Sequence, residues 1–139
     1  MKVIHNSIIP FSGFSYMNLF GTLFTRKTSL SMKRSTLNHE SIHTEQYKDL
    51  LYIFFLILYF IEWLIKIPCS WFYKQPVNQK VTQVAYRSIS LEQEAYYNQY
   101  DFNYLENRKK YNWIKYIFTM YDPSKQKPLI EKDDYIEIK

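Results

Sequence analysis

Glycine and cysteine are scarce in this chain of 139 residues, which contains two glycines and one cysteine. The glycines, Gly13 and Gly21, do not form a glycine-rich loop that would cradle phosphate groups, so the common nucleotide-binding motifs are excluded. Cys69 has no partner for an internal disulfide, and we expect it to be a buried free thiol. Residues 1–6 lack the apolar run of a secretory signal, so we expect a cytoplasmic protein.

A dense stripe of basic residues is also missing. The 18 Lys and Arg residues exceed the 13 Asp and Glu residues and give a net charge of +5, but they are scattered in small groups. A nucleic-acid-binding protein would show a denser stripe and a recognisable motif, so we expect no nucleic-acid partner. The same charge is compatible with weak attraction to an anionic membrane surface.

Aromatic residues are abundant, with 14 Tyr, 10 Phe and 3 Trp. A chain of this length and apolar content can bury a modest core, so we expect an ordered protein. We predict a single domain over residues 1–121 and an extended tail over residues 122–139, where Pro123 and Pro128 break any helical pattern.

Two of the three histidines lie in the H-E-x-x-H motif of residues 39–43. Residues four positions apart lie on one face of a helix, so His39 and His43 can present imidazole nitrogens to one zinc ion. Glu40 lies beside them, where its carboxylate can take a proton from a water molecule that the metal activates. Gln46 continues the same face and is a candidate to orient a ligand. The alternative is a polar helix turn without a metal.

The segments around the motif predict a mixture of strands and helices. We expect β structure over residues 2–27, in which the segment Tyr16–Thr25 is a candidate edge strand that could pair with an extended substrate. A plain scaffold strand is the alternative. A long helix should then run from about Ser35 to Lys66 and end before Pro68.

The remaining segments predict a second, shorter helical region. We interpret residues 68–83 as a linker. A helix should begin with a capping box at Ser90 and Gln93 and continue to residue 110, and residues 111–121 should form a third helical element.

The first predicted helix contains the uncharged run Leu50–Ile61. Its twelve residues are fewer than the ~20 that span a bilayer, although counting on past Glu62 to Ile67 reaches that length. A single span there would separate the histidines from any metal ligand further along the chain, so we favour a buried helix. The aromatic cluster Trp71–Tyr73 leaves docking to a membrane surface open.

A catalytic zinc site usually has a third protein ligand and an open position. No histidine follows His43, which points to a carboxylate on the helix that begins near Ser90. Glu92 and Glu94 are the candidates there, and the small Ala95 on the same face as Glu92 would let the two helices approach closely. We therefore favour Glu92 over Glu94, with stabilisation of the helix N-terminus as the alternative use of both.

The motif of residues 39–43, followed by Glu92-x-x-Ala95, resembles the gluzincin pattern H-E-x-x-H…E-x-x-A-[D/N]. This pattern occurs in HtpX-like and CAAX prenyl-protease-like membrane peptidases and in ImmA/IrrE-like peptidases. The resemblance implies a zinc ion held by two histidines and Glu92, with Glu40 as general base. Tyr96 stands where those families have Asp or Asn. Most of residues 9–110 also resembles a group of small uncharacterised proteins from Bacteroidota, which supplies no activity.

Together these patterns predict an α+β fold, namely a mainly helical zincin-like domain with a short N-terminal β-sheet or hairpin. The predicted function is a zinc-dependent metallohydrolase, most simply a peptidase that acts on peptide or protein substrates. Residues that could stabilise an oxyanion are Tyr86, Arg87, Tyr96 and Tyr100. A zincin-like binding module without catalysis and a structural protein of the membrane surface are the alternatives, and the oligomeric state stays open.

Overall fold

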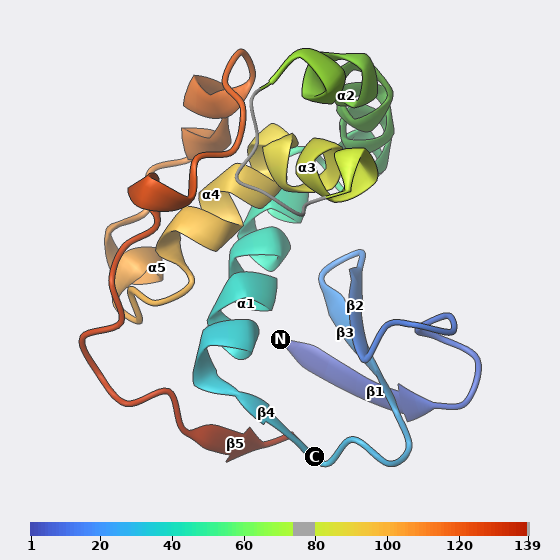
Figure 1. The fold of residues 1–139 in the computed structure, drawn as a ribbon. Helices are drawn as coiled ribbons and strands as arrows, with labels where there is room; N and C mark the ends of the chain where they lie inside the picture. Colours follow the sequence, from blue (N-terminus) through green and yellow to red (C-terminus); the bar gives the residue numbers. More distant parts are fainter. Residues whose placement is uncertain (74–79, 139) are drawn as a thin grey trace.

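The computed structural model describes residues 1–73 and 80–138. The fold is α+β, as predicted, with a three-stranded mixed sheet followed by helices (Figure 1). The strands are β1 (Lys2–Asn6), β2 (Tyr16–Leu19), β3 (Thr22–Arg26), β4 (Ser31–Lys33) and β5 (Tyr135–Glu137). The helices of the described residues are α1 (Arg34–Asp49), α2 (Ile53–Phe72), α3 (Val81–Ser88), α4 (Ser90–Asn98) and α5 (Tyr104–Asn107), with 3₁₀ helices η1 (Asn112–Tyr116) and η2 (Pro123–Lys125).

The three-stranded sheet places β2 at an edge beside α1. The strand order is β1-β3-β2, with β1 parallel and β2 antiparallel to β3. The prediction of a single strand over Tyr16–Thr25 is wrong, because a tight turn divides this segment into β2 and β3. Gly21 adopts a positive φ of 74° in the turn, which glycine accepts without a steric cost. The Asn18 side chain of β2 donates to the Glu40 carbonyl at 2.7 Å and to Thr44 Oγ1 at 2.9 Å. The sheet edge is therefore bonded to the helix that carries the histidines.

The C-terminal segment returns to the start of α1. Strand β5 pairs antiparallel with β4, which directly precedes α1. Asp133 accepts hydrogen bonds from the Ser35 backbone N–H at 2.8 Å and from its hydroxyl at 2.7 Å. The extended tail thus satisfies a free backbone donor at the helix N-terminus.

The prediction of one helix over Ser35–Lys66 is wrong, because the chain turns between α1 and α2. Leu51 and Tyr52 have positive φ values of 50° and 63°, a conformation that a helix cannot contain. The predicted helix end before Pro68 is also wrong, since α2 contains Pro68 and continues to Phe72, although proline supplies no backbone N–H to the helix. Cys69, expected to be buried, is exposed.

The prediction for the second helical region is only partly right. The predicted linker 68–83 is helical at both ends, in α2 and α3, and residues 74–79 lie outside the described residues. The capping box does not form: Ser90 lies inside α4 and donates to Glu62, and Gln93 donates to the Ser88 carbonyl. Helix α4 ends at Asn98, well before residue 110. Within residues 111–121 the helical element is the short 3₁₀ helix η1.

Helix α1 lies between the sheet and α4 (Figure 1). Ile42 of α1 and Ala95 of α4 are both fully buried in one apolar cluster with Tyr104. The small side chain at Ala95 lets α4 pack closely on α1. This packing brings the carboxylates of α4 to the histidine face of α1.

Candidate metal centre

Three buried side chains converge where α1 and α4 meet. One ligand atom from each of His39, His43 and Glu92 lies within 4.8 Å of the others. The Nε2 atoms of the two histidines are 3.1 Å apart. Each lies close to the carboxylate, at 3.2 Å for His39 to Oε2 and 3.3 Å for His43 to Oε1. The triad could hold a metal ion, and its α1 residues show the H-E-x-x-H spacing.

The orientation of His43 follows from a chain of hydrogen bonds. Gln46 donates through Nε2 to the Leu91 carbonyl at 3.0 Å and to Glu94 Oε2 at 2.8 Å. Its Oε1 therefore faces His43 Nδ1 at 2.8 Å and accepts the proton there. In the neutral imidazole, the lone pair of Nε2 then points at the other members of the triad. His39 has a similar neighbour, because its Nδ1 lies 3.2 Å from Gln99 Oε1.

These donors fit a metal ion. Glu92 Oε2 is buried without a hydrogen-bond partner, and the two imidazole lone pairs would face each other and a carboxylate. A cation between them removes this repulsion. Two nitrogens bound tetrahedrally at zinc–nitrogen bond lengths lie roughly 3.3 Å apart, close to the observed separation. An imidazole, imidazole and carboxylate set also suits several transition metals.

Electrostatics at the triad favour a positive charge. Burial alone would lower the pKa of His43, but the adjacent Glu92 carboxylate raises that pKa to about 9. Burial alone would raise the pKa of Glu92, but His43 and His39 hold that pKa well below its usual range. Without a metal, an imidazolium proton supplies this charge. A bound metal ion would take the place of the proton.

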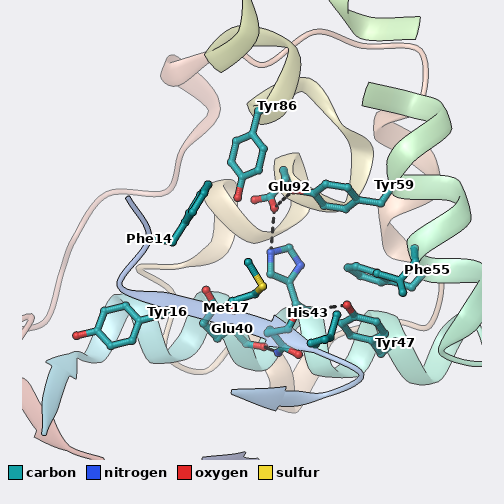
Figure 2. Close-up of a pocket in the computed structure, with 13 residues that line it drawn as sticks. Phe14, Tyr16, Met17, Glu40, His43, Tyr47, Phe55, Tyr59, Tyr86 and Glu92 are labelled. Atoms are coloured by element: carbon teal, nitrogen blue, oxygen red, sulfur yellow. Dashed lines mark hydrogen bonds and ion pairs between the residues drawn. The ribbon is translucent and has the colours of Figure 1, made fainter. Parts of the chain in front are cut away.

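A pocket of about 270 Å³ lies against the triad, between β2, α1 and α2 (Figure 2). His43, Glu92 and Glu40 contribute its ionisable acid and imidazole groups, and Asn18 adds an amide. Its other walls are largely apolar and aromatic, and they include Phe14, Tyr16, Met17, Leu19, Phe55, Leu56, Tyr59 and Tyr86. The triad is therefore reached through an apolar pocket.

Glu40 lies in this pocket next to the triad. Burial raises its pKa, His39 and His43 lower it, and Glu92 raises it again, so the net shift is upward. A carboxylate with a raised pKa accepts a proton more readily than one at the surface. The geometry thus places a basic group beside the three candidate ligands.

Two tyrosines line the pocket beside Glu92. The Tyr59 hydroxyl of α2 donates to Glu92 Oε1 at 2.7 Å. Tyr86 of α3 lies next to Tyr59, and its hydroxyl points into the pocket in Figure 2. Burial raises the pKa of Tyr86 well above its usual range, with Glu92 adding to the effect, so its hydroxyl keeps its proton. Tyr86 can therefore donate a hydrogen bond to a bound molecule.

The structure separates the other sequence candidates from the pocket. The Tyr96 ring packs edge-on against His39, with centroids 4.6 Å apart, and the Arg87 guanidinium lies 5.3 Å above Tyr96. Neither residue lines the pocket, and neither does Tyr100. Tyr96 thus supports the His39 ring by contact, where the gluzincin pattern has a hydrogen-bonding Asp or Asn.

Glu94 lies on the opposite side of α4 from the histidines. It accepts from Arg108 Nε and from the Tyr104 hydroxyl, both at 2.7 Å. Arg108 also bonds to Asp49 at 2.7 Å. Glu94 is therefore held in an ion-paired network, and only Gln46 connects it to the triad.

Sequence reasoning missed Tyr59 and Gln99. Tyr59 lies within an apolar run, where nothing marks its hydroxyl as a partner of Glu92. Gln99 follows Glu92 by seven residues, a helical spacing that returns to the same face and could have suggested it.

Comparisons with protein-family models, curated proteins and solved structures found no match to this chain. The α+β fold and the buried triad define a protein with a candidate metal centre of the H-E-x-x-H type. The functional conclusion depends on the geometry of its own residues.

Proposed function

We propose that this chain is a zinc-dependent hydrolase, most simply a peptidase. The observation that carries the proposal is the position of Glu40. It lies in the same pocket as His43 and Glu92, but it does not belong to the three residues that could bind the metal. A site that only held a structural metal would need no carboxylate there.

His39, His43 and Glu92 would hold the ion. Zinc bound there supplies Lewis-acid activation of a water molecule and of a substrate carbonyl. Glu40 accepts the proton of the attacking water and later donates it to the leaving amine. Its raised pKa favours both transfers, because the group can hold the proton between the two steps.

Tyr86 is the preferred donor to the oxyanion that forms during attack. It lines the pocket and keeps its hydroxyl proton, whereas Arg87 and Tyr96 do not line the pocket. A neutral donor held near the reacting carbonyl stabilises the developing charge.

Edge strand β2 suits an extended peptide. Four successive residues of this strand, Tyr16 to Leu19, line the pocket beside Glu40. One edge of β2 pairs with β3, and an extended substrate could pair with the other. The apolar wall would then receive an apolar or aromatic side chain of the substrate.

Replacing Glu40 by glutamine tests this proposal. Zinc-loaded wild-type protein should cleave members of a fluorogenic peptide library with apolar residues near the scissile bond. Glu40→Gln should keep its zinc and lose ~10²–10⁴-fold in kcat/KM, the usual contribution of a general base. Glu45→Gln, at a solvent-exposed carboxylate of the same helix, should retain activity. Cleavage by Glu40→Gln at the wild-type rate, or no cleavage by the zinc-loaded wild type, would overturn the hydrolase proposal.

A further inference from the structure

Helix α2 buries its charged residues and exposes its apolar ones, which is the reverse of a surface helix in a soluble protein. Its two charged residues, Glu62 and Lys66, are each only 5% exposed. Its outer face, which we define by six residues, is apolar and 48–57% exposed: Ile53, Ile57, Phe60, Ile61, Leu64 and Ile65. These residues recur at helical spacing and form one continuous stripe.

The polar side of α2 is bonded to the protein. Glu62 accepts a hydrogen bond from the Ser90 backbone N–H at 2.7 Å. One turn further on, Lys66 Nζ donates to the carbonyls of Ile117 at 2.8 Å and Thr119 at 2.6 Å. These bonds orient the helix so that its apolar side faces outward.

The composition of α2 matches a lipid environment. The helix has 20 residues, a mean hydropathy of 1.8 over its most apolar window, and only 22% of that window is buried. A core helix of a soluble protein would be mostly buried. Among the described helices, α2 alone is long and apolar enough to cross a membrane.

The surrounding fold favours α2 lying along a membrane surface over crossing it. Buried residues run from Phe55 near its start to Ser70 near its end, so its inner side is covered along most of its length. Helix α1 precedes α2, and helix α4 follows it after α3. Because α1 and α4 share the buried triad, both must lie on the same side of a bilayer. A helix so constrained can insert only its outer face.

Two further exposed apolar side chains lie in and just after η1, on a segment that is bonded to α2. Ile114 is 51% exposed and Phe118 is 98% exposed, and the hydrogen bonds of Lys66 hold this segment against α2. Lys115, next to Ile114, is exposed and would meet the headgroups of anionic lipids.

We propose that the outer face of α2, together with Ile114 and Phe118, inserts into one leaflet of a lipid bilayer with α2 parallel to the membrane surface. A second copy of the chain is the competing occupant of an apolar face, and the measurements below distinguish it from lipid. Phe55 and Tyr59 of α2 line the metal pocket, so docking holds that pocket near the membrane. The inference is independent of whether the site is catalytic.

Vesicle flotation tests the proposal. Wild-type protein should float with phosphatidylcholine vesicles and bind more tightly when phosphatidylglycerol is included. The double variant Phe60→Glu/Leu64→Glu should lose at least about tenfold in vesicle affinity, because two carboxylates would enter the acyl region. Ile130→Glu, at a position that is 88% exposed outside the outer face, should bind like the wild type.

A second measurement needs no change to the outer face. Cys69 is the chain's one cysteine and is exposed on α2, so it accepts an environment-sensitive fluorophore. Its emission should shift to the blue when vesicles are added to labelled wild-type protein. Failure to float together with an unchanged emission would overturn the proposal. So would a lipid-independent dimer that the double variant dissociates, because a second copy would then cover the face.

Discussion

Glu92 and Glu94 lie two residues apart on α4, are both almost fully buried, and have opposite surroundings. On one side, Glu94 meets the Arg108 guanidinium, which also pairs with Asp49. On the other, Glu92 meets two imidazoles and one tyrosine hydroxyl, and one of its oxygens has no hydrogen-bond partner.

The difference shows how one short helix can serve structure and function together. A buried carboxylate needs a compensating positive charge. The chain supplies that charge to Glu94 through a permanently charged arginine, whereas Glu92 faces groups that become positive only by binding a proton or a metal. Gln46 bonds to both sides, accepting from His43 and donating to Glu94. The structural network thereby orients a candidate metal ligand.

The largest effect should come from removing the permanent cation. Arg108→Met leaves the carboxylates of Asp49 and Glu94 buried without a compensating positive charge. It should lower the free energy of unfolding by about 3–5 kcal/mol. Urea unfolding measures this loss. Lys127→Met, which breaks an exposed ion pair with Asp101, should cost less than about 1 kcal/mol. Equal losses would contradict the structural role of Arg108.

The Glu92 side should give the metal-free protein a distinct pH dependence. The pKa of His43 is raised from 6.5 to about 9 by Glu92 against the effect of burial. The protonated His43 therefore stabilises the fold by roughly 3 kcal/mol. This contribution is fully present below about pH 6.5 and is lost as the pH rises towards 9. The pKa of Glu92 is lowered, so the stability that its carboxylate contributes is lost as the pH falls below the usual pKa of a glutamate.

Urea unfolding in the presence of a chelator, repeated between pH 6 and 9, measures this dependence. The metal affinity of the triad should change in the opposite direction and increase over the same range, since protons compete with the metal for the imidazoles. A metal-free stability that rises steadily from pH 6 to 9 would contradict the pairing of His43 with Glu92.

Metal binding should stabilise the wild-type fold. A ligand present at 100 times its Kd adds about 2.7 kcal/mol to the free energy of unfolding. Thermal unfolding with zinc and with a chelator should therefore differ in Tm for the wild type. Glu92→Gln should show little of this difference, and an equal zinc-dependent shift in that variant would indicate binding elsewhere.

The smallest effect should come from replacing Gln46, which links His43 to Glu94. Gln46→Leu removes the acceptor that orients His43 and should lower metal affinity by about 10–100-fold. Competition with a zinc-binding dye measures this affinity. Gln83→Leu, on the exposed side of α3, is the matched control and should bind zinc like the wild type.

The triad could be predicted because its signals are local. The four-residue spacing of His39 and His43 places them on one helical face wherever the helix begins or ends. Glu92 was distinguished from Glu94 by the small Ala95 that follows it on the same face, and the structure places Ala95 in the contact between α1 and α4. The β structure within residues 2–27 was likewise predictable from local composition, but its division was not, because the expected single strand Tyr16–Thr25 is two strands, β2 and β3.

Other features depend on contacts that the sequence does not mark. The turn between α1 and α2 uses positive φ values at Leu51 and Tyr52, without a glycine or proline to signal it. The outward orientation of the apolar face of α2 is set by Glu62 and Lys66, whose partners lie 28 and 51 residues or more further along the chain. The buried helix was predicted because a single span would separate the histidines from a later metal ligand. That prediction is wrong for one face of α2, which the structure exposes.

The most direct test of the account is the metal content of purified, zinc-supplied protein, measured by inductively coupled plasma mass spectrometry. Wild type, Glu92→Gln and Glu94→Gln should be compared, each after its fold is checked by circular dichroism. We predict about one zinc per chain in the wild type and in Glu94→Gln, and a strong loss in Glu92→Gln, because Glu92 lies with the histidines and Glu94 does not. No stoichiometric metal in the wild type, or full retention in Glu92→Gln, would contradict it.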